Sequence, residues 1–261
     1  MGLVLARLSG LMPGLPVKAP RQFNYPYMQQ QHVTLPVADG TSMQVFTVVP
    51  SSDGPLPGLI LIQEAYGVNG HIRNVAERLA AEGFAVIAPE IFHRTAPPGF
   101  EAPYGDFSAV MAHYQAITVD GLSADMKACF DWFQHTPLVD EDRCGAIGFC
   151  LGGRVAFVAN AVLPLGAAVS YYGGMLDSVA HLAPSVSGPH LFQWGGLDKH
   201  ITAEVRSSVT SAMDAAAKPY ASIVYSYADH AFACDDRPAY NAEATREAWA
   251  LSLAFLRNRL S

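Results

Sequence analysis

The strongest chemical signal in the 261-residue sequence is a cysteine at the centre of the glycine-rich segment Gly148-Phe149-Cys150-Leu151-Gly152-Gly153. An apolar strand pattern precedes this segment and an apolar helix pattern follows it. A sharp strand-to-helix turn forces its central residue into a strained conformation, and small residues two positions before and after it relieve the crowding. The pattern predicts a nucleophile elbow, with Cys150 at a helix N-terminus whose dipole and free N–H groups stabilise a thiolate and an oxyanion.

Two residues further along the chain favour this interpretation over a competing one, a buried cysteine in the glycine-rich turn of a nucleotide-binding fold. Asp198 follows the strand pattern that ends at Trp194, and His230 follows the one that ends at Tyr227. Hydrolases of this architecture carry nucleophile, acid and histidine in that order. Open α/β sheets place such groups just past the carboxyl ends of their strands. We therefore expect Cys150, Asp198 and His230 to form a triad.

The elements that must position these side chains alternate between strand and helix. Residues 32–35 and 43–49 are expected to pair as antiparallel strands around the turn formers Asp39-Gly40. Further strands are expected at 59–62, 84–88, 144–149, 166–171, 190–194 and 222–227. Helical periodicity predicts helices at 72–80, 122–133, 151–162, 205–216 and 242–260. This order predicts an α/β fold whose mostly parallel sheet carries helices on both faces.

Composition narrows the class of protein further. Apolar residues make up 51% of the chain and charged residues only 15%, which provides for a large core and excludes a disordered chain. The net charge of −7 offers no electrostatic attraction to nucleic acid or to an anionic bilayer. A small-molecule or protein partner is therefore expected, and the protein could be a monomer or a dimer.

Several segments bear on location and domain organisation. The uncharged stretch 155–176 is interrupted by Asn160, Pro164 and Gly166, which favours a short helix, a turn and a strand over a membrane span. Residues 1–30 are interpreted as an N-terminal extension without the long apolar region of a secretion signal, and residues 31–261 as a single domain. Neither the four cysteines nor the histidines show the spacing of a metal site, so we expect no metal, no cofactor and a cytoplasmic location.

Four motifs, in order, resemble those of the dienelactone hydrolase family of the α/β-hydrolase superfamily. They are Gln63-Glu64-Ala65-Tyr66-Gly67-Val68-Asn69, the segment 148–153, Gly195-Gly196-Leu197-Asp198, and His230-Ala231-Phe232. The resemblance covers residues 30–260 and implies an α/β-hydrolase fold that cleaves a small lactone or activated ester without a cofactor. It also implies a role for each of six positions: nucleophile Cys150, triad partners Asp198 and His230, thiol contact Glu64, and oxyanion-hole N–H groups of Ala65 and Leu151.

The role implied for Glu64 is physically consistent with a buried thiol. A carboxylate held beside the thiol can accept its proton when substrate displaces other contacts, so that a thiolate forms only when there is something to attack. Without the resemblance, Glu64 would be read as a surface residue at the end of a strand.

The sequence departs from the family at the groups that would hold a substrate carboxylate. Members that act on dienelactones use two arginines, one after the strand at 84–88 and one four residues after the catalytic histidine. Arg94 matches the first position, whereas the second is Cys234, and Arg237 lies three residues further on. The resemblance thus implies substrate binding by Arg94, with Arg237 as a displaced second arginine, and the irregular segment 92–118 is the expected lid or substrate loop.

The function expected from these observations is hydrolysis of a small lactone or activated ester through an acyl-thioester on Cys150. Two alternatives stay open: a general carboxylesterase, thioesterase or acyl-transferring relative with the same triad, and a non-catalytic α/β-hydrolase fold that serves as a binding module. Hydrolysis of lactones and aryl esters with and without a thiol alkylator would separate them.

Overall fold

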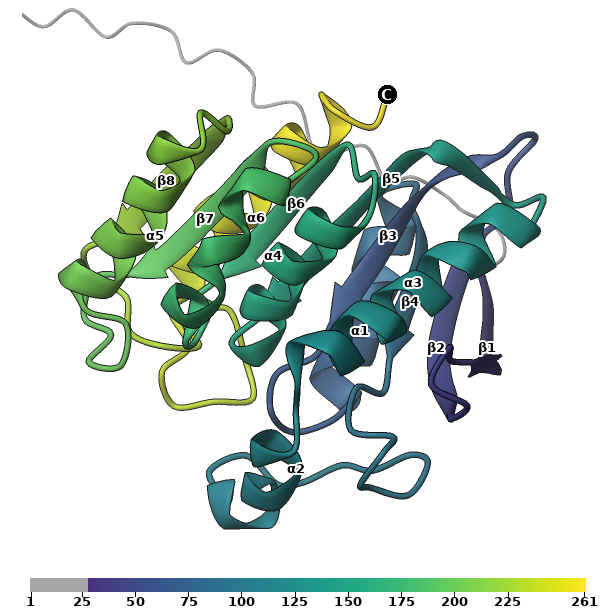
Figure 1. The fold of residues 1–261 in the computed structure, drawn as a ribbon, viewed down its shortest axis with the longest axis horizontal. Coiled ribbons are helices and arrows are strands. Elements are labelled where there is room, and N and C mark those ends of the chain that lie inside the picture. Colours follow the sequence, from purple (N-terminus) through teal and green to yellow (C-terminus); the bar gives the residue numbers. More distant parts are fainter. Residues whose placement is uncertain (1–27) are drawn as a thin grey trace, which may run out of the picture.

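The computed structural model describes residues 28–261, which form one eight-stranded sheet with helices on both faces (Figure 1). The strands are β1 (Met28–Pro36), β2 (Ser42–Pro50), β3 (Leu56–Ile62), β4 (Ala85–Pro89), β5 (Val139–Phe149), β6 (Ala167–Tyr171), β7 (His190–Gly195) and β8 (Tyr220–Tyr225). They lie in the order β1-β2-β4-β3-β5-β6-β7-β8. β2 pairs antiparallel with β1 and with β4, and the remaining neighbours are parallel. The expected mostly parallel sheet is confirmed.

The helices divide between the two faces of the sheet. They are α1 (Gly70–Ala81), α2 (Met111–Gln115), α3 (Val119–His135), α4 (Leu151–Val162), α5 (Ala203–Ala215) and α6 (Ala242–Arg257), with 3-10 segments η1 (Phe107–Ala109) and η2 (Leu176–Ser185). α1 and α6 share one face, where the Arg78 guanidinium lies 4.1 Å from the centre of the Trp249 ring and Arg257 pairs with Glu82. α3 and α4 pack together on the other face.

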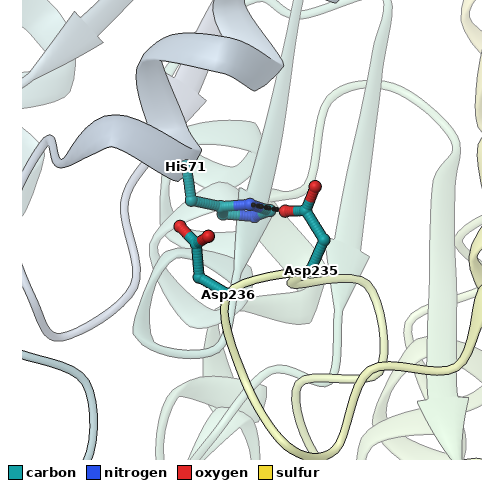
Figure 2. A group of neighbouring side chains, drawn as sticks. All are labelled: His71, Asp235 and Asp236. Atoms are coloured by element: carbon teal, nitrogen blue, oxygen red, sulfur yellow. Dashed lines mark hydrogen bonds and ion pairs between the residues drawn. The ribbon is translucent and has the colours of Figure 1, made fainter.

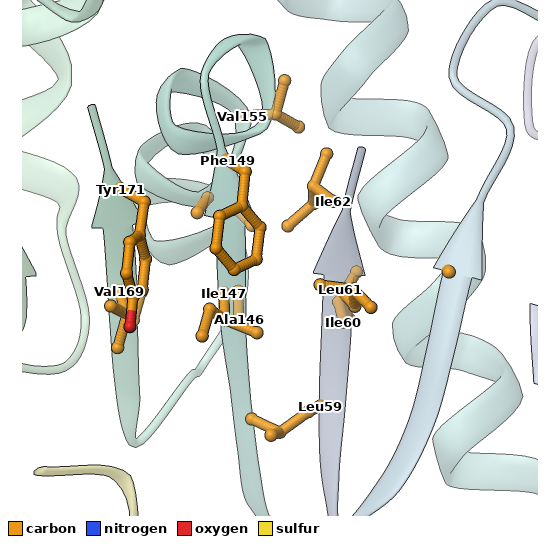
Figure 3. Close-up of a cluster of buried hydrophobic side chains, with 14 of the residues drawn as sticks. Leu59, Ile60, Leu61, Ile62, Ala146, Ile147, Phe149, Val155, Val169 and Tyr171 are labelled. Atoms are coloured by element: carbon orange, nitrogen blue, oxygen red, sulfur yellow. The ribbon is translucent and has the colours of Figure 1, made fainter. Parts of the chain in front are cut away.

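The centre of the sheet is apolar on both sides because helices cover both faces. Leu59, Ile60, Leu61 and Ile62 of β3 are all fully buried, and they pack in one cluster with β5, β6 and α4 (Figure 3). A strand covered on both faces needs no polar alternation, which is why the sequence shows a continuous apolar run there. The packed centre of the sheet therefore fixes the position of the turn that follows β5.

The structure extends some strands beyond their expected bounds. β1 begins at Met28 and β5 at Val139, in polar stretches that show no apolar pattern but pair with β2 and β3. β8 lies two residues earlier than expected, and η2 was not expected. The first three described residues of the expected N-terminal extension belong to β1, whereas the expectations for residues 1–27, including the lack of a secretion signal, lie outside the described residues.

The uncharged stretch 155–176 is divided as expected between a helix, a turn and a strand. α4 ends at Val162, the turn contains Pro164, and β6 begins at Ala167. Within residues 28–261, no helix has the length and apolar character needed to cross a membrane.

A buried polar network anchors α4 to the sheet. The amide of Asn160 donates to His190 Nδ1 at 3.2 Å, which leaves the other ring nitrogen, Nε2, to donate to Ser170 Oγ at 2.8 Å. Ser170 Oγ in turn donates to the carbonyl of Gly153 at 2.5 Å, in the first turn of α4. This chain of bonds requires a neutral imidazole, and burial lowers the pKa of His190 to about 3.

Because the folded pKa of His190 lies below that of an unfolded histidine, the protein should lose stability as the pH falls below about 6.5. Between pH 7 and pH 5, the titration of His190 should lower the free energy of unfolding of the parent by about 2 kcal/mol. The variant His190→Gln lacks this group and should not show this part of the loss. Urea unfolding at the two pH values measures the difference, with His135→Gln on the surface as the matched control. Equal pH dependence in the parent and in His190→Gln would show that His190 is not held neutral.

Candidate active site

Cys150 lies in the turn between β5 and α4 with a left-handed backbone conformation, φ 55° and ψ −114°. Such a conformation is strained for a residue with a side chain and persists only where the surroundings impose it. A Cβ atom on Gly148 would lie 2.0 Å from the carbonyl oxygen of Gly152, and one on Gly152 would lie 2.3 Å from that of Ile62. The glycines therefore permit the close approach of α4 to β3 and β5, and the turn has the geometry of a nucleophile elbow.

The backbone of Cys150 is fixed from both sides. Its N–H donates to the carbonyl of Tyr171 at the end of β6, at 3.0 Å. Its carbonyl accepts from the N–H groups of Gly153 and Gly174, at 3.0 and 3.2 Å. These bonds hold the cysteine half-buried at the carboxyl end of the sheet.

The structure brings the three expected triad side chains into one hydrogen-bonded line. His230 Nε2 lies 3.2 Å from Cys150 Sγ, and His230 Nδ1 lies 2.7 Å from Asp198 Oδ2. The second oxygen of Asp198 accepts from the backbone N–H groups of His200 and Ile201, at 2.8 and 3.1 Å. The carboxylate is therefore held on both oxygens and orients the ring so that Nε2 faces the sulfur.

The groups along this line shift the pKa values of their neighbours. Burial by itself would lower the pKa of His230, but the negative charge of Cys150 and the bond to Asp198 outweigh it and raise the pKa to about 10. Burial would raise the pKa of Asp198, yet its bond to His230 and the two backbone donors hold that pKa below its usual range. The surroundings of His230 thus favour its protonated, imidazolium form.

Glu64 is buried just beyond the end of β3, and its nearest charged partner is Arg237 rather than the thiol. Glu64 Oε1 lies 3.5 Å from a guanidinium nitrogen of Arg237, whereas Oε2 has no hydrogen-bond partner among the described residues. The guanidinium lies over the rings of Tyr66 and Tyr104, 5.8 and 5.6 Å from their centres. Contact between Glu64 and Cys150 stays a prediction, because the sulfur is bonded to His230 here.

Two tyrosines that the sequence did not single out complete this end of the site. Burial and the charge of Glu64 raise the pKa of both Tyr104 and Tyr172, so each keeps its proton. Burial and Glu64 likewise raise the pKa of Cys234 to about 12. Tyr172 directly follows β6, a position whose signal is the same strand end that pointed to Asp198 and His230.

The two backbone donors expected for an oxyanion hole are buried and free of competing acceptors. Neither the N–H of Ala65 nor that of Leu151 donates a hydrogen bond to any residue between 28 and 261. Leu151 is the first residue of α4, where N–H groups have no partner within the helix.

Arg94 is held away from the triad by two carboxylates. Its guanidinium donates to both oxygens of the buried Asp125, at 2.9 and 2.8 Å, and to Asp39 at 2.7 Å. No contact within the described chain joins it to Cys150 or His230. Substrate binding by Arg94 stays a prediction, and it would require the guanidinium to leave partners that already neutralise it.

The segment 92–118, the expected lid or substrate loop, packs against the site. The N–H of Ala102 donates to the carbonyl of Tyr66 at 3.2 Å, and the rings of Tyr66 and Tyr104 meet edge to face. Tyr114 of α2 donates to the sulfur of Met175, just beyond the turn that binds the Cys150 carbonyl. The segment therefore joins both walls of the site.

Among residues 28–261, one cluster of potential metal-ligand atoms lies outside the triad. His71, Asp235 and Asp236 place one potential ligand atom each within 4.8 Å of one another (Figure 2). Both carboxylates are exposed, and His71 Nδ1 already binds Asp235 at 3.1 Å. The contact ties the loop that carries Arg237 to α1, which is a sufficient physical role for it.

Comparisons with known proteins show which family and fold this chain shares. The model of the dienelactone hydrolase family matches residues 43–260. A Synechocystis sp. protein named "Putative carboxymethylenebutenolidase" is 34% identical over 83% of this chain and 92% of its own length. The carboxymethylenebutenolidase of Pseudomonas putida is 29% identical over 88% of this chain and 97% of its own length.

The fold is shared with a solved structure from Klebsiella pneumoniae, named "Putative Dienelactone Hydrolase". The two chains superpose with a TM-score of 0.80 at 31% identity, over 88% of this chain and 99% of the other. The sheet therefore belongs to the α/β-hydrolase fold, and the expected family resemblance is confirmed. From its sequence match and its fold alike, the chain is a member of the dienelactone hydrolase family of hydrolases.

Proposed function

We propose that the protein hydrolyses a small lactone or another activated carboxylic ester through a covalent acyl-thioester on Cys150. The observation that carries the proposal is the line of contacts from Cys150 Sγ to His230 at 3.2 Å and from His230 to Asp198 at 2.7 Å. Nucleophile, base and orienting acid within hydrogen-bond reach are the arrangement that activates a nucleophile. The names of the relatives add support for esters of the lactone class.

The proposed reaction has two halves. The Cys150 thiolate attacks the acyl carbon, and the N–H groups of Leu151 and Ala65 hold the resulting oxyanion. The tetrahedral adduct then collapses to a thioester, and the His230 imidazolium gives its proton to the departing oxygen. In the second half, His230 removes a proton from water, the hydroxide attacks the thioester, and the thiolate leaves. Asp198 keeps the ring oriented and stabilises its charged form throughout.

Glu64 fits this scheme as a proton acceptor for the thiol. Its Oε2 is buried without a partner in the described chain, and its Oε1 contact with Arg237 is long. A carboxylate so weakly held is free to turn when substrate displaces Arg237.

We also propose that the enzyme is located in the cytoplasm, because its four cysteines are free thiols.

Alkylation by iodoacetamide should label Cys150 first and abolish hydrolysis in step with labelling. The other three cysteines, Cys129, Cys144 and Cys234, are buried, and burial raises the pKa of each thiol. Cys150 is the more exposed thiol and faces His230. Peptide mass mapping against residual activity on lactones and aryl esters provides the measurement. Labelling of Cys150 without loss of activity would contradict Cys150 as the nucleophile, and no hydrolysis by the parent would favour a binding module instead.

Substitution of Asp198→Asn should lower kcat by roughly 10²–10⁴-fold, because the ring loses its orienting charge. It should also lower the pKa of His230 from about 10, since the bond to Asp198 helps to raise it. Steady-state kinetics and an NMR titration of the ring measure the two effects. Asp229→Asn is the matched control, because Asp229 bonds only the backbone N–H of His230. Equal kinetic losses in the two variants would contradict the assigned role.

Replacing Glu64→Gln should lower turnover by roughly 10²-fold or more while the melting temperature stays near that of the parent. The amide keeps the shape of the carboxylate but cannot accept the thiol proton. Turnover and thermal unfolding are measured on the same preparation. A large fall in melting temperature with unchanged turnover per folded molecule would make Glu64 a structural residue.

A further inference from the structure

Arg154 is the one lysine or arginine among residues 28–261 that is buried, with 8% of its surface exposed. It lies in the first turn of α4, four residues after Cys150. A buried charge is costly unless an opposite charge or a set of hydrogen bonds compensates it. The surroundings of Arg154 should therefore contain such a partner.

The described residues offer Arg154 no anionic partner. Its Nε has no hydrogen-bond acceptor, and a terminal nitrogen reaches only the sulfur of Met175 at 4.0 Å, which is a weak acceptor. The guanidinium lies 5.4 Å from the centre of the Tyr114 ring. By contrast, Arg237 contacts Glu64 and Arg94 contacts Asp125. Arg154 thus brings a positive charge to the site that nothing in the described chain neutralises.

The position of Arg154 in the helix further destabilises a positive charge that lacks an anionic partner. Cations are disfavoured in the first turn of a helix, because the N-terminal end of the helix dipole is positive. Residues four apart lie on one helix face, and long helical side chains lean toward the N-terminus, here toward Cys150. Met175, which Arg154 contacts, follows Gly174, whose N–H binds the Cys150 carbonyl. The charge therefore lies at the wall of the nucleophile's turn.

We propose that Arg154 binds a carboxylate of the substrate, remote from the bond that is cleaved. A guanidinium holds a carboxylate through charge-assisted hydrogen bonds, and Arg154 has an Nε without an acceptor and a terminal nitrogen whose contact is the weakly accepting sulfur of Met175. Exposed apolar side chains stand nearby on the covering segment and the turn: Phe107, whose ring meets that of Tyr114, and Met175. The substrate class is a lactone or ester that joins a carboxylate to an apolar body. This inference rests on the proposed function of the Cys150 site.

The test compares two lactones of nearly equal shape, 5-oxotetrahydrofuran-2-carboxylate and its neutral primary amide. The preference of the enzyme is the ratio of kcat/KM for the carboxylate to that for the amide. Arg154→Met should lower this ratio roughly ten- to a hundredfold, and Arg154→Lys should restore part of it by restoring the charge. Arg94→Met is the matched control and should keep the parent's ratio, since Asp39 and Asp125 already occupy Arg94.

Binding of tetrahydrofuran-2-carboxylate, which lacks the lactone carbonyl, separates this proposal from the proposed reaction. Calorimetry should detect it with the parent and Arg94→Met, and not with Arg154→Met. Hydrolysis of both lactones with an unchanged ratio in Arg154→Met would overturn the carboxylate site alone. If the protein hydrolyses neither lactone but binds tetrahydrofuran-2-carboxylate through Arg154, the result would support the carboxylate site. It would also contradict the proposed hydrolysis at Cys150. A ratio that falls in Arg94→Met instead would return the role to Arg94.

Discussion

The structure of this site depends on the strained turn at Cys150. A side chain at φ 55° persists only because the N–H and carbonyl of Cys150 are bonded to β6 and to the 173–174 turn, and because glycines let α4 press against β3. The sulfur is thereby lifted above the carboxyl end of the sheet, toward the loops after β7 and β8. The network through Ser170 and His190 fixes the start of the same helix to the sheet, so the position of Cys150 depends on buried contacts of the core.

Charge balance organises the groups around that turn. Asp198 and Cys150 lie on either side of His230, and Glu64 meets Arg237 across a long contact. Each of the two carboxylates thus has a positive neighbour. The buried cation Arg154 differs from Arg94 and Arg237, because no carboxylate of the described chain pairs with it. A site with one positive charge left over is suited to a substrate that carries the missing negative one.

Two positions that the family resemblance links to substrate binding are altered or already paired in this structure. Cys234 occupies the position of the second arginine and keeps its proton, because burial and Glu64 raise its pKa. Arg94 is neutralised by Asp39 and Asp125, although its place in the sequence matches the first arginine. The positions of Cys150, Asp198 and His230 therefore follow from the strand ends, whereas the pairing of the cations follows from how distant segments pack.

The sequence alone determined the alternation of strands and helices, the glycine-rich turn, and the order of Cys150, Asp198 and His230, because these are local patterns or follow from where strands end. It could not determine the pairing of charges, since Arg94 and Asp125 lie 31 residues apart and Glu64 and Arg237 lie 173 apart. Nor did it reveal Arg154, because the apolar pattern of this helix does not show whether its one charged side chain has a partner. Only the tertiary structure decided which cations are neutralised, because burial and partner distance arise when distant segments pack together.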